Sequence, residues 1–117
     1  MSVASADELL RDIHEAASQA VTYVEGYTKD DFLADKRTQQ AAILNLVILG
    51  EAATKLMDNH PATAAAMPDI EWRSMRGMRN RIAHGYYDIN LDVVWETVSV
   101  ALPELIQVLD NLRRNRR

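Results

Sequence analysis

The chain of 117 residues contains no cysteine, which excludes disulfide bonds and thiolate metal sites. It has only four glycines and three prolines, and nowhere do apolar and polar residues alternate over the length of a strand. Residues 1–10 lack a basic segment followed by a long apolar run, so we expect no secretion signal. The longest apolar stretch, 41–53, is interrupted by Asn45 and Glu51 and is shorter than the ~20 residues of a membrane span. We therefore expect a cytoplasmic, helical protein without a membrane partner.

The sequence contains enough hydrophobic residues to form one core. Hydrophobic residues make up 48% of the chain, and its length suits a single domain, for which ~100–150 residues is usual. Apolar residues recur at helical spacing between helix-capping signals. We predict one all-α domain over residues 1–117, an up-and-down bundle of four main helices. These helices are expected near residues 5–26, 35–58, 69–84 and 90–112, with at most one further helical turn in 28–34.

Local signals mark several helix ends. Ser5 and Glu8 have the spacing of a capping box, and Asn90 is a good N-cap for the fourth helix. Residues 61–68 are rich in alanine and bounded by prolines, which indicates a connecting segment. Pro103 lies inside the fourth helix, where it cannot donate a backbone hydrogen bond. We therefore expect that helix to bend.

The formal net charge of −4 hides two clusters of arginine. Residues 73–81 hold four arginines and no acid, and residues 113–117 hold four more. Such local basic character suits contact with a phosphate backbone, whereas the net acidity argues against broad nonspecific nucleic-acid binding. For the second cluster we favour the simpler explanation of a frayed, solvated helix end, which the helix dipole stabilises.

The third predicted helix carries an arginine on its apolar side. At ~100° per residue, Arg79 falls on the face formed by Met75, Met78 and Ile82. A guanidinium in that position needs a partner, a cleft or an interface. His84 lies about 140° around the helix from Arg79, so the two are not neighbours on an ideal helix. Either the helix breaks before His84, or a site forms where two protomers meet.

Glu51 is the only charged residue between Arg37 and Lys55 in the second helix. One interpretation is an exposed ion pair with Lys55 at i,i+4 spacing, worth about 0.3–0.5 kcal/mol. The other is that Glu51 faces the third helix and orients Arg79. The second interpretation predicts that the two side chains lie within salt-bridge reach.

The three histidines are scattered along the chain. His14 lies at the edge of the first apolar stripe, and His60 precedes a proline in a loop. No spacing of histidines and acids resembles a metal site, so we expect no metal and no cofactor. His84 could simply hydrogen-bond free carbonyls at a helix end, or it could exchange protons close to neutral pH in a reaction.

Residues 79–86 read RNRIAHGY. This octet resembles the signature of the HEPN superfamily: an arginine, a polar residue, a short gap and then a histidine. A tyrosine two residues after the histidine makes it similar to the HepT toxins of bacterial and archaeal toxin–antitoxin pairs. The resemblance extends over residues 37–104, through segments 37–39, 49–53, 77–80, 86–89 and 94–95.

The resemblance implies RNA cleavage without a metal ion, in which a 2′-hydroxyl attacks the adjacent phosphorus and a 2′,3′-cyclic phosphate forms. It implies that His84 transfers protons, that Arg79 stabilises the phosphate charge, and that Asn80 positions substrate or histidine. Glu51 would orient Arg79. One histidine per chain is few for acid–base work on two oxygens, and the family's dimers imply a homodimer that brings two motifs together.

The resemblance also implies a partner, a minimal nucleotidyltransferase antitoxin that transfers AMP onto Tyr86. Packing is the alternative role for this tyrosine, and Tyr87 is a competing target. Three functions stay open: a toxin ribonuclease, a catalytically inactive HEPN partner or substrate-binding subunit of the nucleotidyltransferase, and a plain helical dimerisation module. The presence of Arg79, His84 and Glu51 argues against the third.

Overall fold

The structure of the chain, a computed structural model, describes residues 3–115. Within that range it contains helices, turns and loops but no strand. The elements are α1 (Ala6–Tyr23), α2 (Lys29–Leu33), α3 (Lys36–Asn59), α4 (Pro61–Ala65), α5 (Trp72–His84), the 3₁₀ turn η1 (Tyr86–Asp88), α6 (Leu91–Glu96), the π-helical turn η2 (Thr97–Ala101) and α7 (Leu102–Asn115).

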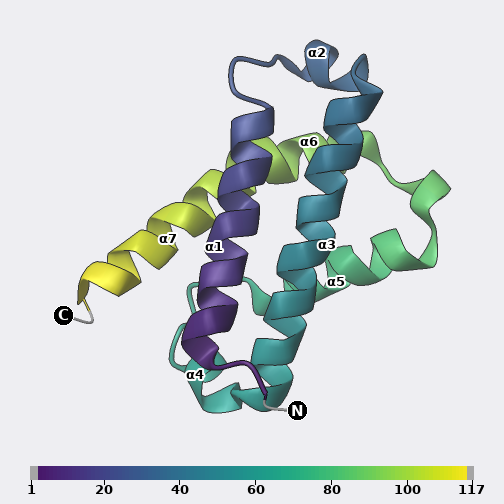
Figure 1. The fold of residues 1–117 in the computed structure, drawn as a ribbon. Helices are drawn as coiled ribbons and strands as arrows, with labels where there is room; N and C mark the ends of the chain where they lie inside the picture. Colours follow the sequence, from purple (N-terminus) through teal and green to yellow (C-terminus); the bar gives the residue numbers. More distant parts are fainter. Residues whose placement is uncertain (1–2, 116–117) are drawn as a thin grey trace.

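The helices form a bundle around a central antiparallel pair. Helices α1 and α3 lie side by side, with α2 at one end of the pair and α4 at the other (Figure 1). Helix α5 packs against α3, and α7 packs against α1. Since α6, η2 and α7 follow one another without a break, they make up the fourth predicted helix. The predicted all-α bundle of four main helices is confirmed.

The core lies between these helices and draws on nearly all of them. Side chains with less than 2% exposure come from α1, α2, α3, α6 and η2; the largest are Ile13, Phe32, Leu46, Leu56, Val94 and Val98. Helix α3 is the one described helix whose length and composition would allow a membrane span. Half of that stretch is buried inside the fold, as in the central helix of a soluble domain.

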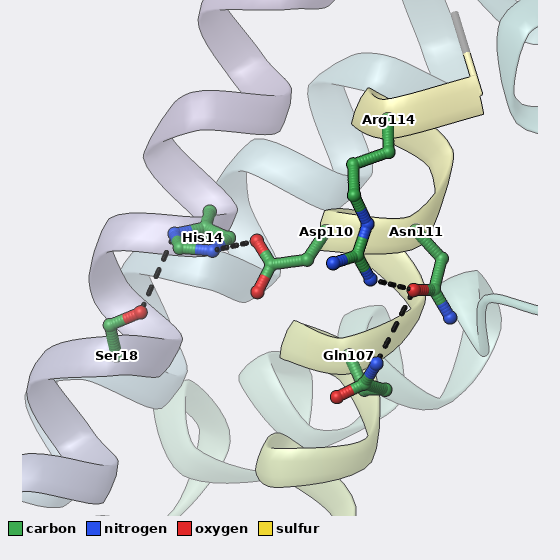
Figure 2. A network of polar contacts seen from close by, with 6 residues as sticks. All are labelled: His14, Ser18, Gln107, Asp110, Asn111 and Arg114. Atoms are coloured by element: carbon green, nitrogen blue, oxygen red, sulfur yellow. Dashed lines mark hydrogen bonds and ion pairs between the residues drawn. The ribbon is translucent and has the colours of Figure 1, made fainter.

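Polar contacts cap the start of α1 and join the helix to α7. Ser5 Oγ accepts a hydrogen bond from the backbone N–H of Glu8 at 3.1 Å, so the predicted cap is present. Figure 2 shows His14 between the two helices, with Nε2 2.9 Å from Asp110 Oδ1 on α7 and Nδ1 3.4 Å from Ser18 Oγ. The side chain of His14 is 28% exposed, which confirms its expected place at the edge of the core.

Helix α3 starts where the sequence predicts, and Asp35 fixes this start. Its carboxylate accepts hydrogen bonds from the Tyr27 hydroxyl at 2.6 Å and from the hydroxyl and backbone N–H of Thr38 at 2.7 and 3.1 Å. These bonds, that from Tyr27 first, lower the pKa of Asp35 to about 2. Because the ionised form is the one bonded, the carboxylate remains a helix cap well into the acidic range.

Helix α5 begins at Trp72, not near residue 69 as the sequence predicts. The indole N–H of Trp72 donates to the carbonyls of Ala64 and Met67, at 3.1 and 3.2 Å, and the ring is 8% exposed. The connecting segment thus wraps around the side chain of Trp72. Its residues form turns there, and α5 begins only at the tryptophan itself. Part of that segment, Pro61–Ala65, is itself a helical turn, with its proline in the first position where no N–H is needed.

Pro103 has the predicted effect on the fourth helix. The backbone N–H of Leu102 donates to the carbonyl of Thr97, five residues earlier, and so closes the π-helical turn η2 just before the proline. A π turn widens the helix and makes room for a ring that would otherwise crowd the preceding turn. The chain accordingly changes direction between α6 and α7 (Figure 1).

The arginine-rich end of the chain is described only in part. Arg113 and Arg114 are exposed in the last turn of α7, where the helix dipole favours cations. Arg114 donates to the side chain of Asn111 within the same helix. Arg116 and Arg117 lie outside the described residues.

Candidate active site

Helices α3 and α5 approach each other closely at Gly50. A Cβ atom built on this glycine would lie 2.5 Å from Arg79 Cβ and 2.9 Å from the carbonyl oxygen of Met75. No side chain fits in this space, so the backbone of α3 touches α5 directly. This approach brings the root of Arg79 against α3, beside the polar residues that follow Gly50.

Arg79 is held by two side chains of α3. Its Nη1 lies 2.9 Å from Glu51 Oε1, and its Nη2 donates to Thr54 Oγ1 at 3.0 Å. The Thr54 hydroxyl in turn donates to the carbonyl of Gly50 at 2.8 Å, which fixes its orientation. The predicted salt bridge between Glu51 and Arg79 is confirmed, and Glu51 is paired with Arg79 instead of Lys55.

A second ion pair joins the same two helices, one turn earlier on α5 and about two turns later on α3. Arg76 Nη2 is 2.8 Å from Asp58 Oδ1. The side chains of Arg79 and Arg76 are 23% and 35% exposed, and those of their carboxylates 47% and 62%. Pairs of such exposure contribute about 0–1 kcal/mol each to stability. Their main effect is on position, because they set the orientation of both guanidinium groups.

His84 lies on another side of α5. The helix continues through His84, and its last backbone hydrogen bond runs from the N–H of Gly85 to the carbonyl of Arg81 at 3.2 Å. The helix thus ends at His84, as the sequence predicts, and of the two alternatives the one in which it breaks before His84 is excluded. Since Arg79 and His84 remain on different faces of one helix, a single chain does not bring them together.

His84 instead shares its side of α5 with Asn80 and Arg81. The three side chains are exposed and line a groove of about 530 Å³ between α5, η1 and α6, together with Asp88 and Asn90. The rest of the lining is largely apolar: Met78, Ile82, Ile89, Val93 and Val94. The sequence reasoning passed over Arg81, although its position three residues before His84 places both on one side of the helix.

Tyr86 and Tyr87 follow α5 in the turn η1. The residues are 42% and 98% exposed, and their rings meet edge to face with centroids 5.6 Å apart. Neither hydroxyl has a hydrogen-bond partner among the described residues. Tyr86 is therefore accessible to a modifying enzyme, and so is Tyr87.

An exposed apolar stripe adjoins the Glu51–Arg79 pair. Leu44 and Ile48 on α3 are 59% and 42% exposed. Spacings of four and then three residues place Leu44, Ile48 and Glu51 along one side of the helix. No described residue covers this stripe, and it ends at the salt bridge.

Within residues 3–115, no group of three or more histidine, aspartate or glutamate side chains could hold a metal ion.

The helical bundle and the arginine–histidine motif on one helix are those of a HEPN-type domain. A family model described as "Ribonuclease HepT-like" matches residues 13–112, which is most of the chain. The protein belongs to this family.

Three relatives illustrate the similarity. The "Probable ribonuclease HepT" of Thermococcus cleftensis is 33% identical over 108 residues, 89% of this chain and 96% of that protein. "Putative RNase MJ0127" of Methanocaldococcus jannaschii is 30% identical over 88% of this chain and 83% of its own length. "Putative RNase TTE0752" of Caldanaerobacter subterraneus is 29% identical over 82% and 83%. No solved structure matches the chain.

Proposed function

We propose that the protein is a metal-independent endoribonuclease, the toxin of a toxin–antitoxin pair that acts in the cytoplasm. The observation that supports this most strongly is the state of its two motif side chains. Arg79 is fixed by Glu51 and Thr54, while His84 stands exposed in a groove with no partner among the described residues. A fixed cation and an accessible imidazole are what phosphodiester cleavage by proton transfer needs. The names of the relatives support ribonuclease activity.

In this reaction the 2′-oxygen of a ribose attacks the adjacent phosphorus and the bond to the 5′-oxygen breaks. The 2′-hydroxyl loses its proton to a base, and the departing 5′-oxygen takes one from an acid. The products are a 2′,3′-cyclic phosphate and a 5′-hydroxyl. His84 serves as a proton-transfer group, Asn80 beside it positions the substrate, and Arg79 stabilises the charge that builds up on the phosphate.

The separation of Arg79 and His84 supports a homodimeric site. If two protomers meet along a two-fold axis near α5, Arg79 of each chain can act with His84 of the other. The apolar stripe of Leu44 and Ile48, which adjoins Arg79, offers a surface for that contact.

The proposed activity is tested by incubating the purified protein with total cellular RNA, with and without excess EDTA. We expect cleavage in both samples and products that end in 2′,3′-cyclic phosphate. Loss of cleavage with EDTA would contradict the metal-independent mechanism. Failure of the wild-type protein to cleave at all would favour the alternative, an inactive partner or substrate-binding subunit of a nucleotidyltransferase.

We further propose that a minimal nucleotidyltransferase antitoxin silences the enzyme by transferring AMP to Tyr86. Exposure alone does not select this tyrosine, since Tyr87 is the more exposed. Its position in the motif selects it, because Tyr86 is the tyrosine two residues after His84, as in the HepT motif. The added phosphate would compete with RNA for the arginines of the site, and the nucleoside would obstruct the groove beside it.

Replacing Tyr86 by phenylalanine should leave RNA cleavage intact and abolish its neutralisation by the cognate transferase and ATP. Tyr87→Phe is the matched control and should still be neutralised. Intact mass and peptide mapping after co-expression would locate the AMP. Modification of Tyr87 alone, or a neutralised Tyr86→Phe variant, would contradict the proposal.

A further inference from the structure

The groove that contains His84 also contains Arg81, whose guanidinium group has no partner among the described residues. The Arg81 side chain is exposed and lines the groove, yet it makes no hydrogen bond or ion pair with any described residue. Arg79 and Arg76 on the same helix are each bound to a carboxylate of α3. Of the four arginines of α5, Arg76 and Arg79 are thus held by α3 and Arg81 is free in the His84 groove, while the exposed Arg73 does not line this groove.

We propose that Arg81 binds an RNA phosphate in this groove and holds the substrate against His84 of the same chain. The inference rests on the proposed ribonuclease function and adds a substrate-binding residue to it. A free guanidinium matches two phosphate oxygens with parallel N–H donors, and neighbouring groove residues can contact the nucleotide. Asn80 and Asn90 offer amide groups there, and the apolar floor offers a surface for a ribose or base.

The negative charge in the groove indicates where the phosphate lies. Asp88 lines the end near Gly85, and its Oδ2 would be 3.3 Å from a Cβ atom at that glycine. A carboxylate repels a phosphate, so the phosphate is confined to the side of Arg81. Removing the charge of Asp88 should therefore strengthen RNA binding, whereas removing that of Arg81 should weaken it.

The test is the affinity for a fluorescent 2′-O-methyl oligouridine of twelve nucleotides, which lacks the attacking hydroxyl and cannot be cleaved. Arg81→Gln should weaken binding about tenfold and lower the slope of log Kd against log salt by about 0.7, as expected for one lost phosphate contact on a single strand. Arg81→Lys should keep most of the affinity, and Asp88→Asn should bind more tightly. Thermal unfolding of all variants should match the wild type.

The control is Arg73→Gln, which removes another exposed arginine of α5, ~12 Å from Arg81 along the helix. It should bind as the wild type does. Equal weakening by Arg73→Gln, or wild-type affinity and salt slope in Arg81→Gln, would overturn the inference, as would a wild-type protein that does not bind the oligonucleotide. Cleavage of total RNA by the wild type decides the proposed ribonuclease function separately, so the two ideas can fail independently.

Discussion

Arg79→Ala and His84→Ala should each lower RNA cleavage by at least 100-fold, and assembling the two inactive chains into one dimer should restore it. The single losses follow from removing a proton-transfer group or a charge-stabilising group, each worth about 10²–10⁴ in rate. The recovery follows from their places on different faces of α5. A mixed dimer has one site with both wild-type residues, and about half of the wild-type rate is expected.

The experiment requires co-expression of the two variants with different affinity tags and purification on both tags in turn. His84→Ala should keep the wild-type unfolding temperature, because His84 is exposed. Arg79→Ala retains the Cβ atom at the contact with Gly50 and should remain folded, with a loss of about 0–1 kcal/mol from its ion pair. His60→Ala serves as a control histidine outside the site and should cleave normally. A mixed dimer that is as inactive as the two single variants would contradict a site shared between protomers. Sedimentation of the wild-type protein as a monomer would exclude the dimer on which such a site depends.

Most of the fold could be predicted because its signals are local. Asn90 caps a helix as predicted, and Asp35 caps α3 at its predicted start, since a side-chain oxygen accepts the backbone N–H two or three residues later without tertiary help. The start of α5 could not be predicted in this way. It depends on hydrogen bonds from the buried Trp72 ring to carbonyls in the preceding segment, and these exist only once the chain has folded around it.

The candidate site could be predicted only in part from the sequence. The pairing of Glu51 with Arg79 follows from two charges on otherwise apolar helix faces, for which mutual neutralisation is the least costly arrangement. The helix end at His84 was predictable, but whether a break would turn His84 toward Arg79 stayed open, because a glycine after a histidine permits a break and does not impose one. The helix keeps its last hydrogen bond at Gly85, and the imidazole consequently faces the groove shared with Arg81.

Gly50→Ala should lower the free energy of unfolding by about 1–3 kcal/mol, the usual cost of an overpacked contact. The added Cβ atom would lie 2.5 Å from Arg79 Cβ and 2.9 Å from the carbonyl oxygen of Met75. Rotation of a side chain cannot relieve either clash, because the Met75 oxygen is a backbone atom and Arg79 Cβ is bonded directly to the backbone. Helices α3 and α5 must therefore separate, and Arg79 moves away from Glu51 and Thr54.

Gly77→Ala is the matched control, since it makes the same change inside α5 where a Cβ atom would meet nothing within 4 Å. It should raise the free energy of unfolding by up to ~1 kcal/mol, because alanine favours a helix over glycine. Urea unfolding measures both variants, and RNA cleavage well below the midpoint shows whether folded Gly50→Ala has lost the position of Arg79. Wild-type stability in Gly50→Ala would mean that the two helices do not touch at this glycine, and the fixed orientation of Arg79 would lose its structural basis.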